Sequence, residues 1–159
     1  MLDQNLLKLV EEIKAASSGQ YISTAESCTG GLVASYLTSI AGSSNYFTTG
    51  IVSYSNEAKM KLLNVNSKTL DNFGAVSEEV AKEMAVGLLQ ASGSDIAISL
   101  TGVAGPDGGT KGKPIGMVCF GIVTSQGSKT VTRNFSGTRS EIRQQSCEVS
   151  LRLILSALN

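Results

Sequence analysis

The order in which strand-like and helix-like segments alternate is the feature that most constrains this 159-residue chain. Residues 21–25 alternate like a short strand, a small polar turn follows, and residues 32–40 return to a helical pattern. Further strands are predicted at 47–54, 95–100, 116–124 and 129–135, and further helices at 3–16, 56–63, 77–91 and from 140 to the end. A hairpin signature separates the last two strands. The order predicts an α/β fold: a three-layer α/β/α sandwich with a mixed, mostly parallel sheet, and a C-terminal hairpin followed by a long helix.

Length and composition predict one domain spanning residues 1–159. The chain falls within the roughly 100–200 residues typical of a domain, and a chain of this size buries about 70% of its unfolded surface. Hydrophobic residues make up 42% and charged residues 16%, which excludes an intrinsically disordered protein. We find no internal repeat, low-complexity tract or charge block.

The charge balance argues against nucleic acid as a partner. Lys plus Arg number 13 and Asp plus Glu number 13, and the aromatic side chains are four Tyr and four Phe without Trp. Neither a basic surface nor many stacking platforms are available. No apolar run reaches the roughly 18 residues of a membrane span, so we expect neither export nor membrane insertion. The expected compartment is the cytoplasm.

The absence of histidine narrows the possible chemistry. It excludes Ser-His-Asp and Cys-His catalysis and zinc held by imidazole, so proton transfer must use Lys, Tyr, a carboxylate, Cys or water. The three cysteines, Cys28, Cys119 and Cys147, are widely spaced and indicate neither disulfides nor a metal site. The carboxylates show no spacing typical of a hard-cation loop. We therefore expect no metal and no organic cofactor.

A first candidate cluster, residues 26–31, lies where a strand hands over to a helix. A hydroxyl such as that of Ser27 would there be surrounded by free backbone N–H groups, a geometry suited to an oxyanion or a phosphate. The amides of Thr29, Gly30 and Gly31 are the candidate donors. A Ser or Thr helix cap with glycines that only permit a tight turn is the alternative, and Cys28 is interpreted as a small packed residue.

A second cluster, residues 54–59, lies at a strand end across one strand-helix-strand passage from Ser27. Neighbouring strands place their ends close together, so Ser27, Tyr54 and Lys59 could meet. A lysine whose pKa is lowered by burial is the natural general base for a serine hydroxyl in a chain without histidine, and Tyr54 could relay the proton. The alternative is that Tyr54 packs as a strand residue and Lys59 is solvated like Lys61.

Two further clusters could hold a ligand. The glycine-rich residues 101–112 follow an apolar strand, and the backbone around Thr101, Ala104 and Gly105 could converge on an anion. Arg139 and Arg143 begin the last helix, where a guanidinium could reach a phosphate or carboxylate. A mobile loop and a capped helix with solvated arginines are the respective alternatives.

Together these clusters resemble the CinA carboxy-terminal domain family, which includes nicotinamide-nucleotide amidases, and the resemblance covers nearly the whole chain. The segments that carry it are 24–31 (TAESCTGG), 54–59 (YSNEAK), 74–78 (GAVSE), 101–109 (TGVAGPDGG) and 113–116 (KPIG). The chain departs from the family pattern at Thr138, where Asp is common, and at Ser146, where Ala is common. The resemblance implies a stand-alone amidase domain without the amino-terminal domain of longer members.

The resemblance also implies an activity: hydrolysis of the carboxamide of nicotinamide mononucleotide to nicotinic acid mononucleotide and ammonia. Ser27 matches the family nucleophile, and Tyr54 and Lys59 match its proton-handling partners. The family fold is a three-layer α/β/α arrangement with one strand antiparallel to the rest, and the resemblance suggests a homo-oligomer. A non-catalytic nucleotide-binding or regulatory module, or an amidohydrolase for another amide, remains the alternative.

Overall fold

The computed structural model describes residues 1–159, and its centre is a five-stranded mixed sheet. The strands are β1 (Ile22–Glu26), β2 (Phe47–Val52), β3 (Ile96–Gly102), β4 (Met117–Thr124) and β5 (Gly127–Asn134). They lie in the order β2-β1-β3-β4-β5. β1 pairs in parallel with β2 and β3, while β4 pairs antiparallel with both β3 and β5. β4 therefore runs opposite to the other four strands.

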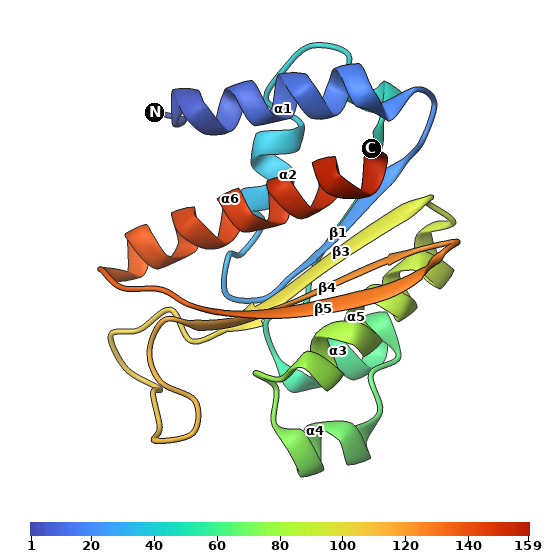
Figure 1. Cartoon of the computed structure of the whole chain (residues 1–159). Coiled ribbons are helices and arrows are strands. Elements are labelled where there is room, and N and C mark those ends of the chain that lie inside the picture. Colours follow the sequence, from blue (N-terminus) through green and yellow to red (C-terminus); the bar gives the residue numbers. More distant parts are fainter.

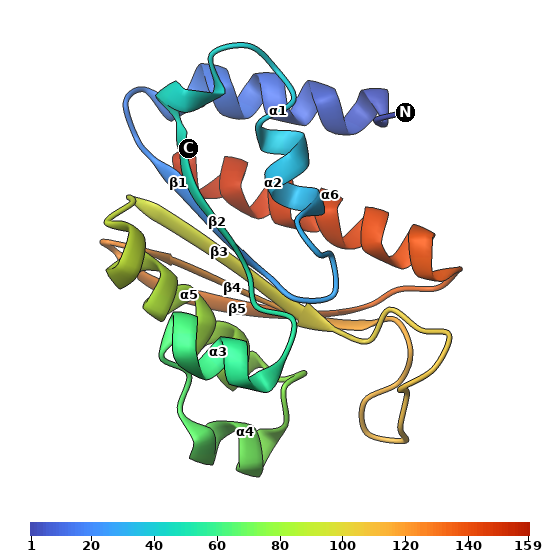
Figure 2. The same ribbon diagram turned by 180° about the vertical axis from the view of Figure 1, so that it is seen from behind.

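Helices cover both faces of this sheet (Figures 1 and 2). One layer contains α1 (Gln4–Ser17), α2 (Leu32–Leu37) and α6 (Arg139–Leu158). The opposite layer contains α3 (Asn56–Leu63), α4 (Ser67–Phe73) and α5 (Glu78–Ser92), and a short 3-10 turn, Ser43–Asn45, precedes β2. The three-layer sandwich, the C-terminal hairpin and the long last helix are thus confirmed.

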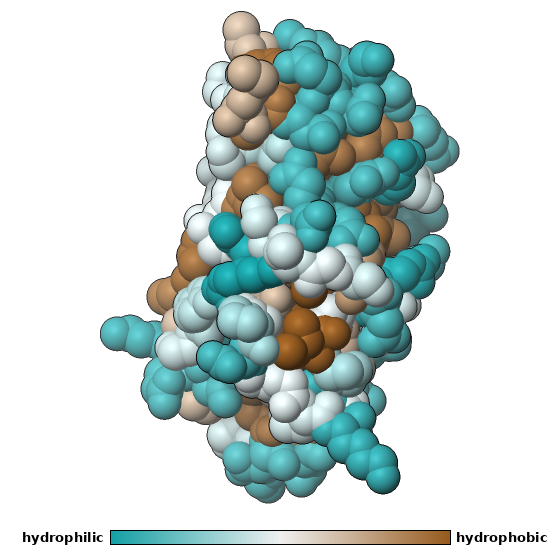
Figure 3. Space-filling model, turned by 90° about the vertical axis from the view of Figure 1, so that its left-hand side faces the viewer, coloured by the Kyte–Doolittle hydropathy of each residue, from teal (hydrophilic) through white to brown (hydrophobic).

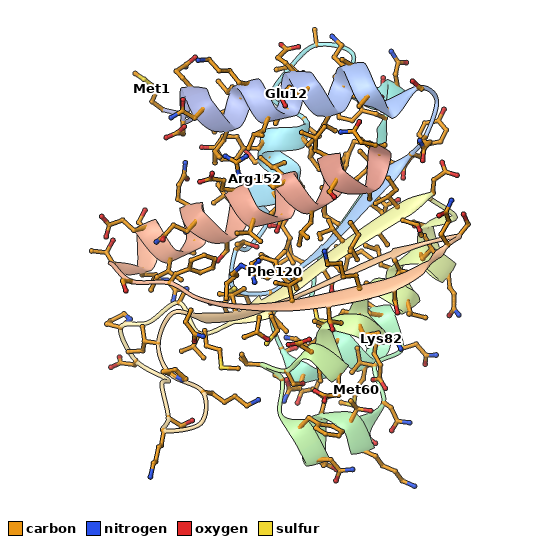
Figure 4. The ribbon with its side chains drawn as sticks, in the orientation of Figure 1. Met1, Glu12, Met60, Lys82, Phe120 and Arg152 are labelled. Carbon is orange, nitrogen blue, oxygen red and sulfur yellow. The ribbon has the colours of Figure 1, made fainter.

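Two apolar cores lie on either side of the sheet. The larger contains the inward faces of α1, α2 and α6, and Figure 4 shows Phe120 of β4 between the sheet and α6. The smaller packs α3 and α5 against the other face, where Met60 lies. The central strands β1 and β3 are almost wholly buried because both of their faces are covered.

The structure differs from the sequence prediction mainly between residues 38 and 76. α2 ends at Leu37, three residues earlier than predicted, and α4 was not predicted at all. α4 has only seven residues, and of these Leu70 alone is buried, so it lacks the repeated apolar spacing that identifies a helix in a sequence. Its start is set instead by Asn66, whose side chain accepts from the Lys68 amide.

Close packing between α3 and α5 depends on Gly87. A Cβ atom at this position would lie 1.7 Å from the carbonyl oxygen of Leu63, the last residue of α3. Only glycine lets the two helices approach so closely. α3, which follows β2 in the chain, is thereby held against α5. None of the helices has the length and apolar character needed to cross a membrane.

Candidate active site

The candidate site lies beyond the carboxyl ends of the parallel strands. After β1 the chain turns into α2 on one face of the sheet, and after β2 it turns into α3 on the opposite face. Neighbouring strand ends whose connections diverge in this way leave a crevice, the usual position of ligand sites in open α/β sheets. Ser27 follows β1 directly, and Lys59 lies in the first turns of α3.

The turn that carries Ser27 is held by the buried carboxylate of Glu26, which is 1% exposed. This carboxylate accepts from the Thr29 hydroxyl at 2.7 Å and from the amides of Val33 and Ala34 at 2.9 and 3.0 Å. It therefore satisfies amides at the start of α2 that otherwise lack a partner. This role of Glu26 was not predicted, although an acid in the turn that leads into a helix is its signal.

Glycines complete the turn after Ser27. Gly30 and Gly31 adopt φ values of +59° and +100°, which side chains rarely allow. The Gly30 amide donates to the Ser27 carbonyl at 3.0 Å, while the amides of Cys28 and Thr29 donate to no protein acceptor. The Cys28 N–H therefore remains available to a ligand next to Ser27, whereas Thr29 is fully buried.

Lys59 is buried, with 2% of its side chain exposed, and no carboxylate is paired with it. Its Nζ lies 3.0 Å from Ser27 Oγ and 2.9 Å from the Ser53 carbonyl oxygen. Burial lowers the pKa of Lys59 from its ordinary value of 10.5, because the charged form loses its hydration. The pair thus combines a hydroxyl with a lysine amine that donates to it and whose charged form is disfavoured by burial.

Two neighbouring groups are not placed for the same chemistry. Cys28 is buried, and burial raises the pKa of its thiol to about 11, so the thiol stays protonated near neutral pH. Tyr54 is 60% exposed, and its hydroxyl accepts from Arg139 at 2.9 Å. Lys59 reaches only the carbonyl oxygen of Tyr54, at 3.5 Å. The structure thus brings Ser27 and Lys59 together but leaves the Tyr54 hydroxyl bonded elsewhere.

A cavity of about 290 Å³ opens above this pair. Its polar side chains come from Ser27, Tyr54, Asn56, Lys59, Thr101, Asp107 and Arg139. Backbone from Thr101 to Gly105 forms another wall, and the Thr101 hydroxyl donates to the Ala75 carbonyl rather than into the cavity. Figure 3 shows this side of the molecule, where a small apolar patch is bordered by pale and hydrophilic side chains. The sequence analysis had not singled out Asn56 or Asp107.

The two arginines of α6 lie in different surroundings. Arg139 lines the cavity and bridges it, donating to the Gly105 carbonyl at 2.8 Å and to the Tyr54 hydroxyl. Arg143 donates to the Thr29 carbonyl at 2.8 Å and is not part of the cavity wall. Thr29, Gly30 and Gly31 also lie outside that wall. Arg143 thus supports the turn, while Arg139 faces the ligand space.

No group of three or more Cys, Asp and Glu side chains is arranged to hold a metal ion. The expectation that neither metal nor organic cofactor is required stays a prediction.

Comparisons with known proteins agree with this arrangement. Residues 4–158 match the model of the CinA C-terminal domain. A nicotinamide-nucleotide amidohydrolase, PncC, of Enterobacter agglomerans is 48% identical over 158 residues, which cover 98% of this chain and 96% of that protein. A CinA-like protein of Chloroherpeton thalassium is 54% identical over 149 residues. The match covers 90% of this chain and 35% of that relative, so the chain spans about a third of the longer CinA-like proteins.

Solved structures show the same fold. The crystal structure of the competence/damage inducible protein CihA from Agrobacterium tumefaciens superposes with a TM-score of 0.95 at 40% identity, covering 100% of this chain and 98% of that one. A CinA superfamily protein from Klebsiella pneumoniae superposes with a TM-score of 0.93 at 36% identity, covering 98% of each chain.

Proposed function

Because the chain belongs to the CinA C-terminal domain family, we propose that residues 1–159 form an amidase domain that hydrolyses the carboxamide of nicotinamide mononucleotide to nicotinic acid mononucleotide and ammonia. The observation that carries the proposal is the 3.0 Å contact between the buried Lys59 amine and the Ser27 hydroxyl at the floor of a cavity. The nearly full-length similarity to a nicotinamide-nucleotide amidohydrolase supports the choice of substrate.

In the proposed reaction Ser27 is the nucleophile and Lys59 the general base. Neutral Lys59 takes the hydroxyl proton as Ser27 Oγ bonds to the carboxamide carbon. The resulting ammonium gives the proton to the amide nitrogen, the C–N bond breaks, and ammonia leaves an acyl-enzyme. Water, activated by the neutral Lys59 amine, then hydrolyses this ester and restores Ser27. The lowered pKa of Lys59 supports this role, because an ordinary lysine is protonated at neutral pH.

Backbone amides hold the oxyanion in this proposal. The Cys28 amide in the cavity wall has no protein acceptor, and the amides of Ala104 and Gly105 in the opposite wall have none either. The Thr29 amide also lacks one but lies outside the wall. N–H groups fixed before the reaction stabilise developing negative charge without reorganisation, and one such donor is typically worth about 2.7–4 kcal/mol. The turn at Gly30 and Gly31 keeps the Cys28 donor beside Ser27.

Arg139 is proposed to bind the substrate phosphate. It lines the cavity, and a guanidinium can meet a phosphate with paired hydrogen bonds. Its contact with the Tyr54 hydroxyl gives that residue a part in the same subsite. The role of Tyr54 in proton transfer stays a proposal that needs its hydroxyl to turn from Arg139 towards Lys59 in the substrate complex. Arg143, bonded to Thr29, is the second candidate for the phosphate.

The deciding experiment measures ammonia release from nicotinamide mononucleotide, nicotinamide riboside and free nicotinamide with wild type and Ser27→Ala. We expect turnover of the nucleotide by wild type only, with the nucleotide still bound by Ser27→Ala in calorimetry. Binding without turnover by wild type would favour the non-catalytic nucleotide-binding module, and turnover of a different amide would favour another amidohydrolase. Equal rates for both proteins would refute the covalent mechanism.

A cytoplasmic location and a homo-oligomeric state complete the proposal. The homo-oligomer follows from the family and the location from the sequence, and a small-molecule nucleotide, rather than nucleic acid or a membrane, is the expected partner. Three free and buried cysteines are consistent with a reducing compartment. Sedimentation of the purified protein measures the oligomeric state directly.

A further inference from the structure

We propose that Asp107 makes the cavity selective for an amide whose aromatic ring carries a positive charge, the pyridinium ring of an oxidised nicotinamide nucleotide. The inference rests on the proposed function and adds a residue that determines specificity. It concerns the charge of the ring. Neither the Ser27–Lys59 pair nor Arg139 offers a negative group that would attract a positively charged ring.

Asp107 is the one carboxylate among the residues that line the cavity. Its side chain is exposed and accepts no hydrogen bond from the protein, and the only close ion pair in the chain is Arg152–Glu148 on the outer surface of α6. Arg139 belongs to the same wall, yet its guanidinium is bonded to Gly105 and Tyr54 instead. Asp107 therefore presents to whatever enters a carboxylate that is engaged in no close ion pair or hydrogen bond.

The loop that carries Asp107 is fixed at both ends. The Val103 amide donates to the Met117 carbonyl at 2.9 Å, and the Gly116 amide donates to the Val103 carbonyl at 2.7 Å. Ile115 packs under the loop so closely that a Cβ at Gly105 would lie 2.7 Å from its Cγ2 atom. Arg139 binds the Gly105 carbonyl two residues before Asp107. The backbone on both sides of Asp107 is thus anchored at the cavity.

The substrate has charges of both signs. Nicotinamide mononucleotide has a fixed positive charge on its ring nitrogen and a negative phosphate at the other end, whereas its reduced form has an uncharged dihydropyridine ring of nearly the same shape. With the phosphate at Arg139, the ring approaches Ser27 and Lys59, where Asp107 is the one carboxylate that lines the cavity. From the shared cavity wall Asp107 can attract such a ring, because opposite charges a few ångströms apart near a protein surface attract appreciably.

The test compares Asp107→Asn with wild type and with Asp71→Asn as a matched control. Asp71 lies on α4, is exposed and unbonded, and its substitution changes the net charge by the same amount. Two quantities are measured at low and high salt: kcat/KM for nicotinamide mononucleotide, and the inhibition constant of 1,4-dihydronicotinamide mononucleotide as a competitive inhibitor. Circular dichroism checks that each variant is folded.

We expect Asp107→Asn to lower kcat/KM for the oxidised nucleotide about 3- to 10-fold at low salt, mainly through KM, with a smaller effect at high salt because ions screen the exposed pair. The inhibition constant of the reduced nucleotide should stay within about twofold. Asp71→Asn should change neither quantity.

The outcomes separate the two proposals. If wild type releases ammonia from the nucleotide but Asp107→Asn behaves like Asp71→Asn, the inference is wrong and the proposed function stands. Equal weakening of binding for the oxidised and reduced nucleotides would also overturn the inference. Asp107 would then support the shape of the loop and would not interact with the charge of the ring. No turnover of the nucleotide by wild type would refute the proposed function and this inference with it.

Discussion

Replacing Lys59 by Met separates the catalytic role of the buried amine from its effect on stability. Met keeps a long, unbranched apolar side chain in the same space but removes the amine that contacts Ser27 and the Ser53 carbonyl. Because a positioned general base contributes roughly 10²- to 10⁴-fold, we expect kcat to fall by about that factor. Stability should respond differently, and in a manner that depends on pH.

The direction in which the free energy of unfolding changes with pH follows from the lowered pKa of Lys59. Between that lowered pKa and the ordinary value of 10.5, the unfolded chain binds a proton at Lys59 that the folded protein does not. The free energy of unfolding of wild type therefore rises with pH in this window, by up to about 1.4 kcal/mol per pH unit. Below the window the folded protein must bury an ammonium, and that penalty is present in full.

The variant lacks this penalty but has a cost of its own. Without Lys59 the fully buried Ser53 loses the donor to its carbonyl, and an unsatisfied buried acceptor costs about 1–3 kcal/mol. Lys59→Met should thus be as stable as wild type, or more stable, below the lowered pKa. By pH 10.5 wild type should be the more stable by about 1–3 kcal/mol, since only the hydrogen-bond term then remains.

Urea unfolding followed by circular dichroism from pH 6 to 10.5 measures this difference, and ammonia release measures activity. Lys59→Arg should also be inactive, because a guanidinium keeps its proton. Lys61→Ala is the control: Lys61 is exposed on the same helix, and its loss should leave both activity and stability nearly unchanged. A stability difference that does not vary with pH would show that the pKa of Lys59 is not lowered, and full activity of Lys59→Met would exclude it as the base.

Three further predictions test the surroundings of the pair. Gly87→Ala should destabilise the protein by about 1–3 kcal/mol in urea unfolding, despite the higher helix propensity of alanine, because the new Cβ would lie 1.7 Å from the Leu63 carbonyl; unchanged stability would disprove the close approach of α3 and α5. Arg139→Ala should weaken binding of the nucleotide roughly 10- to 100-fold and binding of the riboside much less, whereas Arg143→Ala should weaken binding of both equally. The reverse pattern would assign the phosphate contact to Arg143. Exhaustive chelation should leave ammonia release intact. If chelation abolished ammonia release and one specific divalent ion restored it, the prediction that no metal is required would be wrong.

The sequence by itself determined the order of elements and predicted the kind of chemistry. Local periodicity identified all five strands and most helices, because a strand or helix with one apolar face repeats its pattern every two or 3.6 residues. The missing histidines directed attention to lysine as a base, and the turn after β1 singled out Ser27. Short elements with few buried residues, such as α4, leave no such periodic signal.

Only the tertiary structure decided which of these side chains meet. Lys59 and Lys61 look alike in the sequence, and Lys59 is buried because α3 packs on α5 and turns that side towards Ser27. Arg139 and Arg143 are one helical turn apart, yet one faces the cavity and the other the Thr29 carbonyl. Burial, and with it the lowered pKa of Lys59, depends on neighbours distant in the chain, which local patterns do not record.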